Sequence, residues 1–466
     1  MDLKNKNTRF GCILVCFLII CGNLTSCKKF VDIDAPKGRQ DLATTFNSEG
    51  AATAAILDIY FRYEADMLYI NAAAGAASDE MGTEDFFITA FLNNDVPVEG
   101  FVNDTYLWAT PFYQIRRCNL AIKGINQSAT LSGSVKNQLL GEVLFLRGLQ
   151  FFNLVNLYGG VPLTISDTES ENTMLPRASA EEVWNQIFLD LQKAKSLLNP
   201  EYPSAQRARA NKYAASALLA RAYLYHKDWG KAEAEASEVI TSGIYGLTAP
   251  GLTFKNTSNE TILQLYTQTG TSSLAPGYIP FTPDSSPMVY LSSGFEQAFE
   301  KNGVLDDARK TNWTDVNDLG MRYITKYPTA FGSSDEYTIV LRLAEIYLIR
   351  AEARAWQNKL NGQNSSESDL NVIRDRAGLL PKLNLDRTGL LKAIEQERKV
   401  ELFGEYMHRW FDLKRTPGFA DPAKSRADEV LAPLKGEFWQ SEDVYFPIPG
   451  SQIILNRNLI QNKGYL

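Results

Sequence analysis

The stretch from Val135 to Tyr158, VKNQLLGEVLFLRGLQFFNLVNLY, constrains the fold more than any other part of the sequence. Positions at steps of three and four follow one face of an α-helix. These positions are Leu139, Val143, Leu146, Gln150, Leu154 and Leu157. The apolar stripe is widened by Leu140, Phe151, Phe152 and Val155. A stripe this wide predicts a helix that is buried on most sides and ends at Gly159-Gly160.

The next two segments also have helical patterns. Ser179 and Glu182 have the spacing of a capping box at a helix start. Residues 211–240 predict two helices joined by a turn around Trp229, with apolar and small residues at the offsets of a tetratricopeptide unit. The positions are Ala220, Tyr223, Ala232, Ala236 and Val239. Ala344 and Tyr347 repeat one of these steps, so we expect a mostly α, tetratricopeptide-like scaffold; the alternative is a generic helical hairpin.

Two parts of the chain are rich in loops. Residues 245–336 contain many Gly, Pro, Ser and Thr, with short strand-like pieces such as Thr261–Tyr266. Residues 63–108 have the same character. Their many aromatic residues argue against disorder. After the second stretch, helices are expected at 337–359, 368–377 and 386–411, followed by an extended tail.

The N-terminus has the layout of a secretory signal. Three basic residues, Lys4, Lys6 and Arg9, precede an apolar run that is too short for a membrane span. The run is followed by Leu24-Thr25-Ser26-Cys27, which resembles the bacterial lipobox, where cleavage precedes a cysteine that is then acylated. We therefore expect lipidation at Cys27 and stable anchoring through several acyl chains. The alternative is an ordinary signal peptide ending near a cysteine.

Cleavage would leave a mature chain of 440 residues. Losing Asp2 and the three basic residues leaves 44 basic against 53 acidic residues. This acidic balance, without basic runs, argues against nucleic acid as a partner. Cys118 would be the only unmodified cysteine, so no disulfide is expected, and a packed core thiol is its simplest role.

The expected organisation is a signal peptide at 1–26, a lipidated tether at 27–45 and a single α-helical domain at 46–466. Within that domain we expect N-terminal helices and loops at 46–134 and tetratricopeptide-like helices at 135–244. The loop-rich insertion spans 245–336, and the C-terminal helices and tail span 337–466.

Glu397, Glu401 and Glu405 are the strongest candidates for chemistry, because they lie one helical turn apart. Two such carboxylates could approach the spacing of a retaining glycosidase. A structural ion-pair helix explains them better, since Arg398 and Arg409 lie at favourable spacings and would lower the pKa of the acids. We assign no catalytic residue.

The sequence lacks the residues that other catalytic or metal-binding sites require. The chain has only two histidines, His226 and His408, and no Gly-rich phosphate loop. His226 falls in the predicted tetratricopeptide turn, where a surface or capping role is expected. Four aspartates could bind calcium but do not match an EF-hand, so solvated loop charge is the simpler interpretation. They are Asp306, Asp307, Asp315 and Asp318. No metal or other cofactor is expected.

Five segments together resemble the SusD/RagB family of Bacteroidetes outer-membrane nutrient-binding lipoproteins. They are GEVLFLRGLQFFNLVNLYGGVPL, PRASAEEVWNQIFLDLQKA, NKYAASALLARAYLYHKDWGKA, ERKVELFGEYMHRWFDLKR and YFPIPGSQIILNRNLIQNKGY. They occur in the family's order, behind a lipobox. In GEYMHRW the family more often has a glycine before His-Arg-Trp, a departure that concerns a local turn.

The resemblance implies a fold, a location and partners. Family members are lipid-anchored in the outer membrane, facing the cell exterior, and have a tetratricopeptide-like scaffold. They cover a SusC-like TonB-dependent transporter and capture glycans or other oligomeric nutrients without catalysis. Two alternatives remain: a tetratricopeptide scaffold for protein partners, and a secreted hydrolase. The ligand itself stays open among glycans and peptides.

Seven aromatic residues in the loop-rich stretches are the predicted ligand-binding residues. Sugars place C–H faces on exposed rings, and loops on a rigid scaffold usually carry binding. The seven are Tyr69, Phe86, Phe87, Phe91, Tyr278, Tyr290 and Trp313. Any one of them could instead pack its own loop. Trp108 is a weaker candidate, because its surroundings predict a helix start that would bury it.

The lipobox gives the first testable prediction. Cys27→Ala removes the sulfur that would carry the diacylglyceryl group, so the variant should be neither processed at this site nor acylated. Metabolic labelling with a fatty acid and mass spectrometry of the N-terminus measure both. A variant still cleaved there and still acylated would contradict the assignment.

Overall fold

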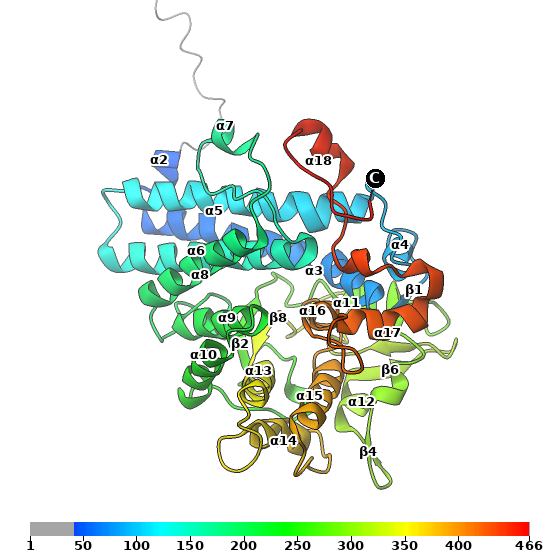
Figure 1. The fold of residues 1–466 in the computed structure, drawn as a ribbon. Helices are drawn as coiled ribbons and strands as arrows, with labels where there is room; N and C mark the ends of the chain where they lie inside the picture. Colours follow the sequence, from blue (N-terminus) through cyan, green and yellow to red (C-terminus); the bar gives the residue numbers. More distant parts are fainter. Residues whose placement is uncertain (1–41, 466) are drawn as a thin grey trace, which may run out of the picture. The chain divides into compact units, whose positions relative to one another are not determined.

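The computed structural model describes residues 42–465 (Figure 1). The predictions for the leader, for Cys27 and for most of the tether lie outside these residues. The short helix α2 (Leu42–Thr45) ends where one compact unit begins, and this unit holds all the other elements.

Long helices form the N-terminal half of the unit. They are α3 (Glu49–Ala77), α5 (Thr110–Gln127), α6 (Gly133–Tyr158) and α8 (Ala180–Leu197). They run side by side in Figure 1, and α6 contacts both α5 and α8. From Leu139 onward α6 is buried almost all round, as its wide apolar stripe predicts. The predicted capping box is present at the start of α8, where the Ser179 hydroxyl accepts the Glu182 N–H at 3.2 Å.

The tetratricopeptide-like prediction is confirmed by the next layer. Helices α9 (Lys212–Tyr225) and α10 (Trp229–Thr241) contact each other, and α10 contacts α13 (Leu343–Trp356). Small residues at the helix contacts, such as Ala220, Ala232 and Ala236, are fully buried. Helices α14 (Ser366–Arg376) and α15 (Arg387–Glu401) continue the layer. A core cluster centred on Leu348, Leu370 and Ile394 joins α13, α14 and α15.

The insertion has little regular structure. Its short strands belong to four two-stranded antiparallel sheets. Strand β2 (Thr261–Leu265) pairs with β8 (Thr338–Arg342), and both are fully buried. The other pairs are β1 (Met81–Thr83) with β3 (Val289–Leu291), β4 (Lys301–Asn302) with β5 (Leu305–Asp306), and β6 (Thr314–Val316) with β7 (Arg322–Ile324). Short helices α11 (Ala275–Tyr278) and α12 (Ala308–Trp313) lie between them.

Three sequence predictions need correction. The stretch 63–108 is less loop-rich than expected, because α3 continues to Ala77 and the π-helix η2 (Asn103–Ala109) leads into α5. The alanine-rich end of α3, residues 71–77, is buried on every side and therefore shows no apolar stripe in the sequence. The helix expected at 386–411 is two helices, α15 and α16 (His408–Arg415), since the backbone is left-handed at Tyr406 and Met407.

The third correction concerns the tail, which is not simply extended. It contains α17 (Arg426–Lys435), η6 (Gly436–Phe438), η7 (Ser441–Val444) and α18 (Gly450–Leu455). The remaining short elements are α4 (Thr89–Leu92), α7 (Glu169–Asn172), η3 (Ala205–Arg207), η4 (Pro250–Leu252) and η5 (Glu296–Ala298). Within residues 42–465, no helix is long and apolar enough to cross a membrane.

Gly270 and Gly320 separate two effects on the stability of the insertion. Both have a φ of +76°, but a Cβ on Gly270 would lie 2.0 Å from the Ser334 carbonyl oxygen, while one on Gly320 meets nothing within 4 Å. Gly320→Ala should lower the unfolding free energy by about 1 kcal/mol, the cost of a left-handed alanine. Gly270→Ala should cost about 1–3 kcal/mol more, because the backbone must move. Chemical denaturation measures both, and equal losses would contradict the crowding at Gly270.

Candidate functional site

The two loop-rich parts of the chain meet in the short sheet of β1 and β3. Gly82 lies opposite Tyr290 in this pairing. A Cβ on Gly82 would be 2.5 Å from the Tyr290 ring, so the ring lies directly over glycine backbone. Segments about 200 residues apart in the sequence therefore share one surface region, which neither segment predicts by itself.

A row of five aromatic rings leads from α3 to this region. Tyr69 stacks on Tyr106 with ring centroids 4.4 Å apart, and Tyr106 forms a T-shaped pair with Phe101, with centroids 5.7 Å apart. Phe101 then contacts Phe87 at 5.3 Å, and Phe87 contacts Phe86 at 5.5 Å. Such pairs stabilise one another beyond simple burial. The half-buried tyrosines thus support the last three rings, which are open to solvent.

These three rings line the larger of two neighbouring cavities, here called the aromatic cavity, with a volume of about 730 Å³. Phe86 is 85% exposed, Phe101 49% and Phe87 46%. Segment 84–102 forms the wall, and Asp85 holds its first turn by accepting the Phe87 N–H at 2.9 Å. Polar groups also line this cavity, namely the Asn93 side chain and three carboxylates. The cavity therefore combines ring faces with hydrogen-bonding groups, the combination that a sugar requires.

The second cavity has a volume of about 560 Å³ and shares Asn93 with the first. Tyr290 and the exposed ring of Phe438 line it, together with Asp79 and Lys435. The Lys435 ammonium donates to the carbonyl oxygens of residues 76 and 77 at 3.1 and 2.7 Å, at the C-terminal end of α3. Burial lowers the pKa of Lys435 to about 7. This lysine therefore joins α17 to α3 and fixes the cavity wall.

Asp79 ties the same wall to the C-terminal helices. Its carboxylate accepts hydrogen bonds from Arg409 Nε at 2.6 Å and from Lys399 Nζ at 2.8 Å. Burial raises the pKa of Asp79, but the two cations outweigh burial and hold it well below its ordinary value. The carboxylate is thus ionised and already neutralised, so it supports the cavity rather than offering a free charge.

The structure separates the seven predicted rings into two groups. Phe86 and Phe87 line the aromatic cavity and Tyr290 lines its neighbour, while Tyr69 is half-buried in α3 rather than in a loop. Phe91 also lines the aromatic cavity but is buried, with its ring against that of Phe446. Tyr278, which donates to the Gly404 carbonyl, and Trp313 are buried and line neither cavity.

Sequence reasoning missed Phe101, Tyr106 and Phe438. Phe101 and Tyr106 stand in the stretch 63–108, and the aromatic pattern of that stretch is a signal that includes them. Phe438 follows a helix in the tail, which gave no such signal. Trp108 is buried, as its position near a helix start predicts.

A third cavity, of about 540 Å³, lies between α3 and residues 204–209 and has mostly apolar lining groups. Its charged groups are already engaged. Arg209 makes a two-pronged contact with Glu142 at 3.0 and 2.7 Å, and Asp58 binds Arg62. This cavity therefore offers a sugar fewer free hydrogen-bonding groups than the aromatic cavity does.

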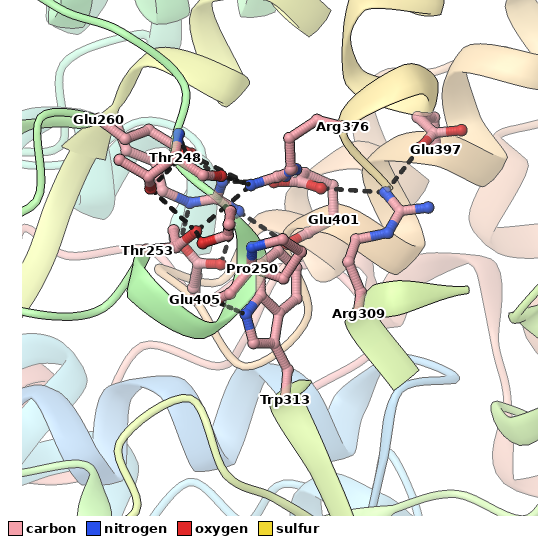
Figure 2. A network of polar contacts seen from close by, with 12 residues as sticks. Thr248, Pro250, Thr253, Glu260, Arg309, Trp313, Arg376, Glu397, Glu401 and Glu405 are labelled. Carbon is pink, nitrogen blue, oxygen red and sulfur yellow. Dashed lines mark hydrogen bonds and ion pairs between the residues drawn. The ribbon is translucent and has the colours of Figure 1, made fainter. Parts of the chain in front are cut away.

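Trp313 lies beside a buried network of charged side chains, shown in Figure 2. Its indole N–H donates to the Pro250 carbonyl at 2.8 Å. The Lys326 ammonium lies 4.6 Å and the Arg376 guanidinium 5.2 Å from its ring centroid. The ring face that a ligand would need is thus occupied by cations of the protein itself. The ring is therefore buried, and the expectation that it is exposed in a loop is wrong.

Glu401 is the centre of this network. It accepts hydrogen bonds from Arg309 at 3.0 Å, from Arg342 at 2.5 Å and from Arg376. Burial raises the pKa of Glu401, but the three guanidinium groups outweigh burial and hold it well below its ordinary value. Burial also raises the pKa of Glu405, but Arg342 and Lys326 outweigh burial and hold it below its ordinary value. Both carboxylates are therefore ionised and unsuited to donate a proton.

The ion-pair interpretation of this segment is confirmed, but the predicted partners are wrong. Arg398 pairs with Asp412 at 2.6 Å instead of Glu401, and Arg409 pairs with Asp79 instead of Glu405. Glu405 does not continue the helical face because α15 ends at Glu401. Glu401 is already paired with Arg309, Arg342 and Arg376.

The other candidate groups have structural positions. Cys118 is a fully buried free thiol, and burial raises its pKa to about 12. His226 is the C-cap residue of α9 and lies 3.0 Å from Glu181. Asp307, one of the four candidate calcium ligands, is buried against Arg309. Across residues 42–465, the structure gathers no group of three or more His, Cys, Asp or Glu side chains suited to a metal ion.

Comparison with known proteins gives consistent matches. Residues 302–465 match the family described as "SusD family", and residues 30–224 match one described as "Starch-binding associating with outer membrane". SusD-like protein P25 of Formosa agariphila is 24% identical, covering 97% of this chain and 99% of that protein.

Two solved structures have the same fold. Surface glycan-binding protein A from Bacteroides uniformis has a TM-score of 0.76 at 18% identity, covering 89% of this chain and 99% of that one. A structure described as a laminarin-binding SusD-like protein has a TM-score of 0.73 at 22% identity, covering 90% and 99%. The helical scaffold expected from the sequence is therefore shared with proteins named for glycan binding.

The network predicts a large effect of losing Glu401. Glu401→Gln leaves three buried arginines without their common counter-charge, so the unfolding free energy should fall by about 3–5 kcal/mol. Glu296→Gln is the matched control, because Glu296 also contacts two cations, Lys310 and Arg322, but is half exposed. That change should cost less than about 1 kcal/mol. Chemical denaturation measures both, and equal small losses would contradict the importance of the network.

The pH dependence of stability gives an independent readout. Glu401 titrates near 4.5 in an unfolded chain and lower in the folded protein. Its contribution is therefore fully present above pH 4.5 and is lost as the pH falls toward the folded pKa. The parent should lose stability below pH 4.5 more steeply than Glu401→Gln. Identical slopes would show that Glu401 is not held in its ionised form.

Proposed function

This chain belongs to the SusD/RagB family, and from that premise we propose that it binds oligosaccharides, or other oligomeric nutrients, in the aromatic cavity. The observation that carries the proposal is the meeting of three exposed rings, Phe86, Phe87 and Phe101, with unpaired polar groups in one cavity. Buried rings such as Trp313 pack against other side chains of the protein, whereas these three rings are exposed to solvent. An exposed apolar group of this kind typically marks a binding surface.

The proposal describes a binding protein without catalysis. The carboxylates with catalytic spacing in the sequence, Glu397, Glu401 and Glu405, are buried and are neutralised by arginine and lysine side chains. A scaffold that binds protein partners is a weaker alternative, because the exposed aromatic surface lies on the irregular segments rather than in a groove between the repeat helices.

We further propose that acyl chains on Cys27 hold the protein on the outer membrane, facing the cell exterior, where it passes its ligand to a SusC-like TonB-dependent transporter. This part of the proposal depends on family membership and on the lipobox. Affinity purification of the full chain after gentle detergent extraction should recover the transporter with it. Repeated recovery of the lipoprotein alone, with the transporter expressed, would contradict the partnership.

The binding site is tested by removing its rings. Phe86→Ala and Phe87→Ala should each weaken binding of an oligosaccharide by about 1–3 kcal/mol, as aromatic hot-spot residues do, which is roughly ten- to hundredfold in Kd. Calorimetry with a ligand identified on a glycan array measures the loss.

Phe281→Ala is the matched control for these variants. Phe281 is 82% exposed but pairs with Phe331 outside the aromatic cavity, so its loss should leave Kd unchanged. Parent-like affinity in both cavity variants, with their folds intact, would place the site elsewhere.

A further inference from the structure

The aromatic cavity has an unbalanced charge. Glu84, Asp95 and Glu99 line it, and all three are exposed. Within residues 42–465 none of these carboxylates takes part in an ion pair or in a side-chain hydrogen bond. No lysine, arginine or histidine of the described chain lines the cavity beside them. The hydrogen-bonding capacity of the cavity is therefore mostly that of free, negatively charged acceptors.

Nearby cations do not offset this charge. Lys435 faces the neighbouring cavity, and its three N–H donors go to two carbonyl oxygens of α3 and to the side chain of Asn94. Arg409 and Lys399 are bound to Asp79. Asp443, whose pKa burial raises to about 6, is close enough to Asp95 for the two charges to interact. The field in the cavity thus remains negative.

The carboxylates also lack the arrangement of a metal site. No group of three or more suitable ligands gathers anywhere in the described part of the chain. A bound cation that would bridge these carboxylates to an acidic sugar is therefore not supported. What remains is a set of acceptors spaced around ring faces, which matches a ligand with many hydroxyl donors.

We infer that the aromatic cavity selects uncharged oligosaccharides and rejects glycans that carry uronate or sulfate groups. The inference rests on the proposed function and adds the class of ligand. Hydroxyl groups of a neutral sugar donate to Glu84, Asp95 and Glu99, and its C–H faces lie on the phenylalanine rings. A ligand carboxylate or sulfate meets three like charges and no cation, which weakens binding by about tenfold or more at low salt.

Matched glycan pairs test the inference. The folded chain from residue 28 onward, which keeps the whole described unit, is assayed on immobilised pairs that share one backbone. Suitable pairs are methyl-esterified and de-esterified oligogalacturonides, and xylan and glucuronoxylan oligosaccharides. Among the pairs that bind, the neutral member should bind at least tenfold more tightly. This preference should shrink at high salt, because the charges are exposed and screened.

Each outcome has a distinct meaning. Equal or tighter binding of an acidic member overturns the inference but leaves glycan binding intact. Binding of no glycan, in these pairs or on a broad array, overturns the proposed function and the inference with it. Preference for the neutral member that does not change with salt would show that shape, and not charge, selects the ligand, and would also overturn the inference.

Charge variants assign the effect to the three carboxylates. The triple variant Glu84→Gln, Asp95→Asn, Glu99→Gln keeps the side-chain sizes, so the acidic member of a pair should gain about tenfold in affinity at low salt. The control triple variant Glu201→Gln, Asp318→Asn, Asp375→Asn makes the same change in net charge at exposed positions outside the cavity. It should leave the preference as in the parent. A gain of equal size in both triple variants would mean that overall charge, and not this cavity, sets the preference.

Discussion

The pairing of Arg342 with Glu401 is the contact that holds the insertion against the C-terminal helices. Arg342 ends the buried strand β8 and also contacts Glu260 and Glu405, so one guanidinium joins the insertion to the end of α15. Arg309 and Arg376 bring α12 and α14 to the same carboxylate (Figure 2). Such a network stabilises little compared with apolar packing, but breaking it leaves uncompensated buried charge. It therefore fixes how an insertion with little regular structure lies against the helices.

This constraint explains why the insertion is ordered and why its rings have different roles. Its inner side faces the network, so Trp313 is surrounded by cations and buried. Its outer part reaches β1 through β3, where Tyr290 lies over Gly82 beside the aromatic cavity. Asp79 and Lys435 then connect this region to α16 and α17. A rigid helical scaffold thus holds irregular segments in fixed positions, the arrangement on which binding sites are usually built.

The sequence predicts the helices well and the site only in part. The stripe of α6 and the capping box of α8 are local patterns, so they are visible without tertiary information. The end of α15 is not visible, because apolar spacing continues through the left-handed turn at Tyr406 and Met407. Strands of three residues, such as β1 and β3, have too little pattern to predict their pairing. Phe86 and Trp313 are both rings in loop-rich sequence, and only the buried charges around Trp313 distinguish them.

Solvent-facing rings on this scaffold are proposed to form a sugar-binding cavity. A crystal structure of the protein with an oligosaccharide identified by array screening tests this proposal most directly. Ligand density is expected against the faces of Phe86, Phe87 or Phe101, with sugar hydroxyls within hydrogen-bonding distance of Glu84, Asp95 or Glu99. Ligand density confined to another surface, such as the cavity between α3 and residues 204–209, with the aromatic cavity empty, would contradict it.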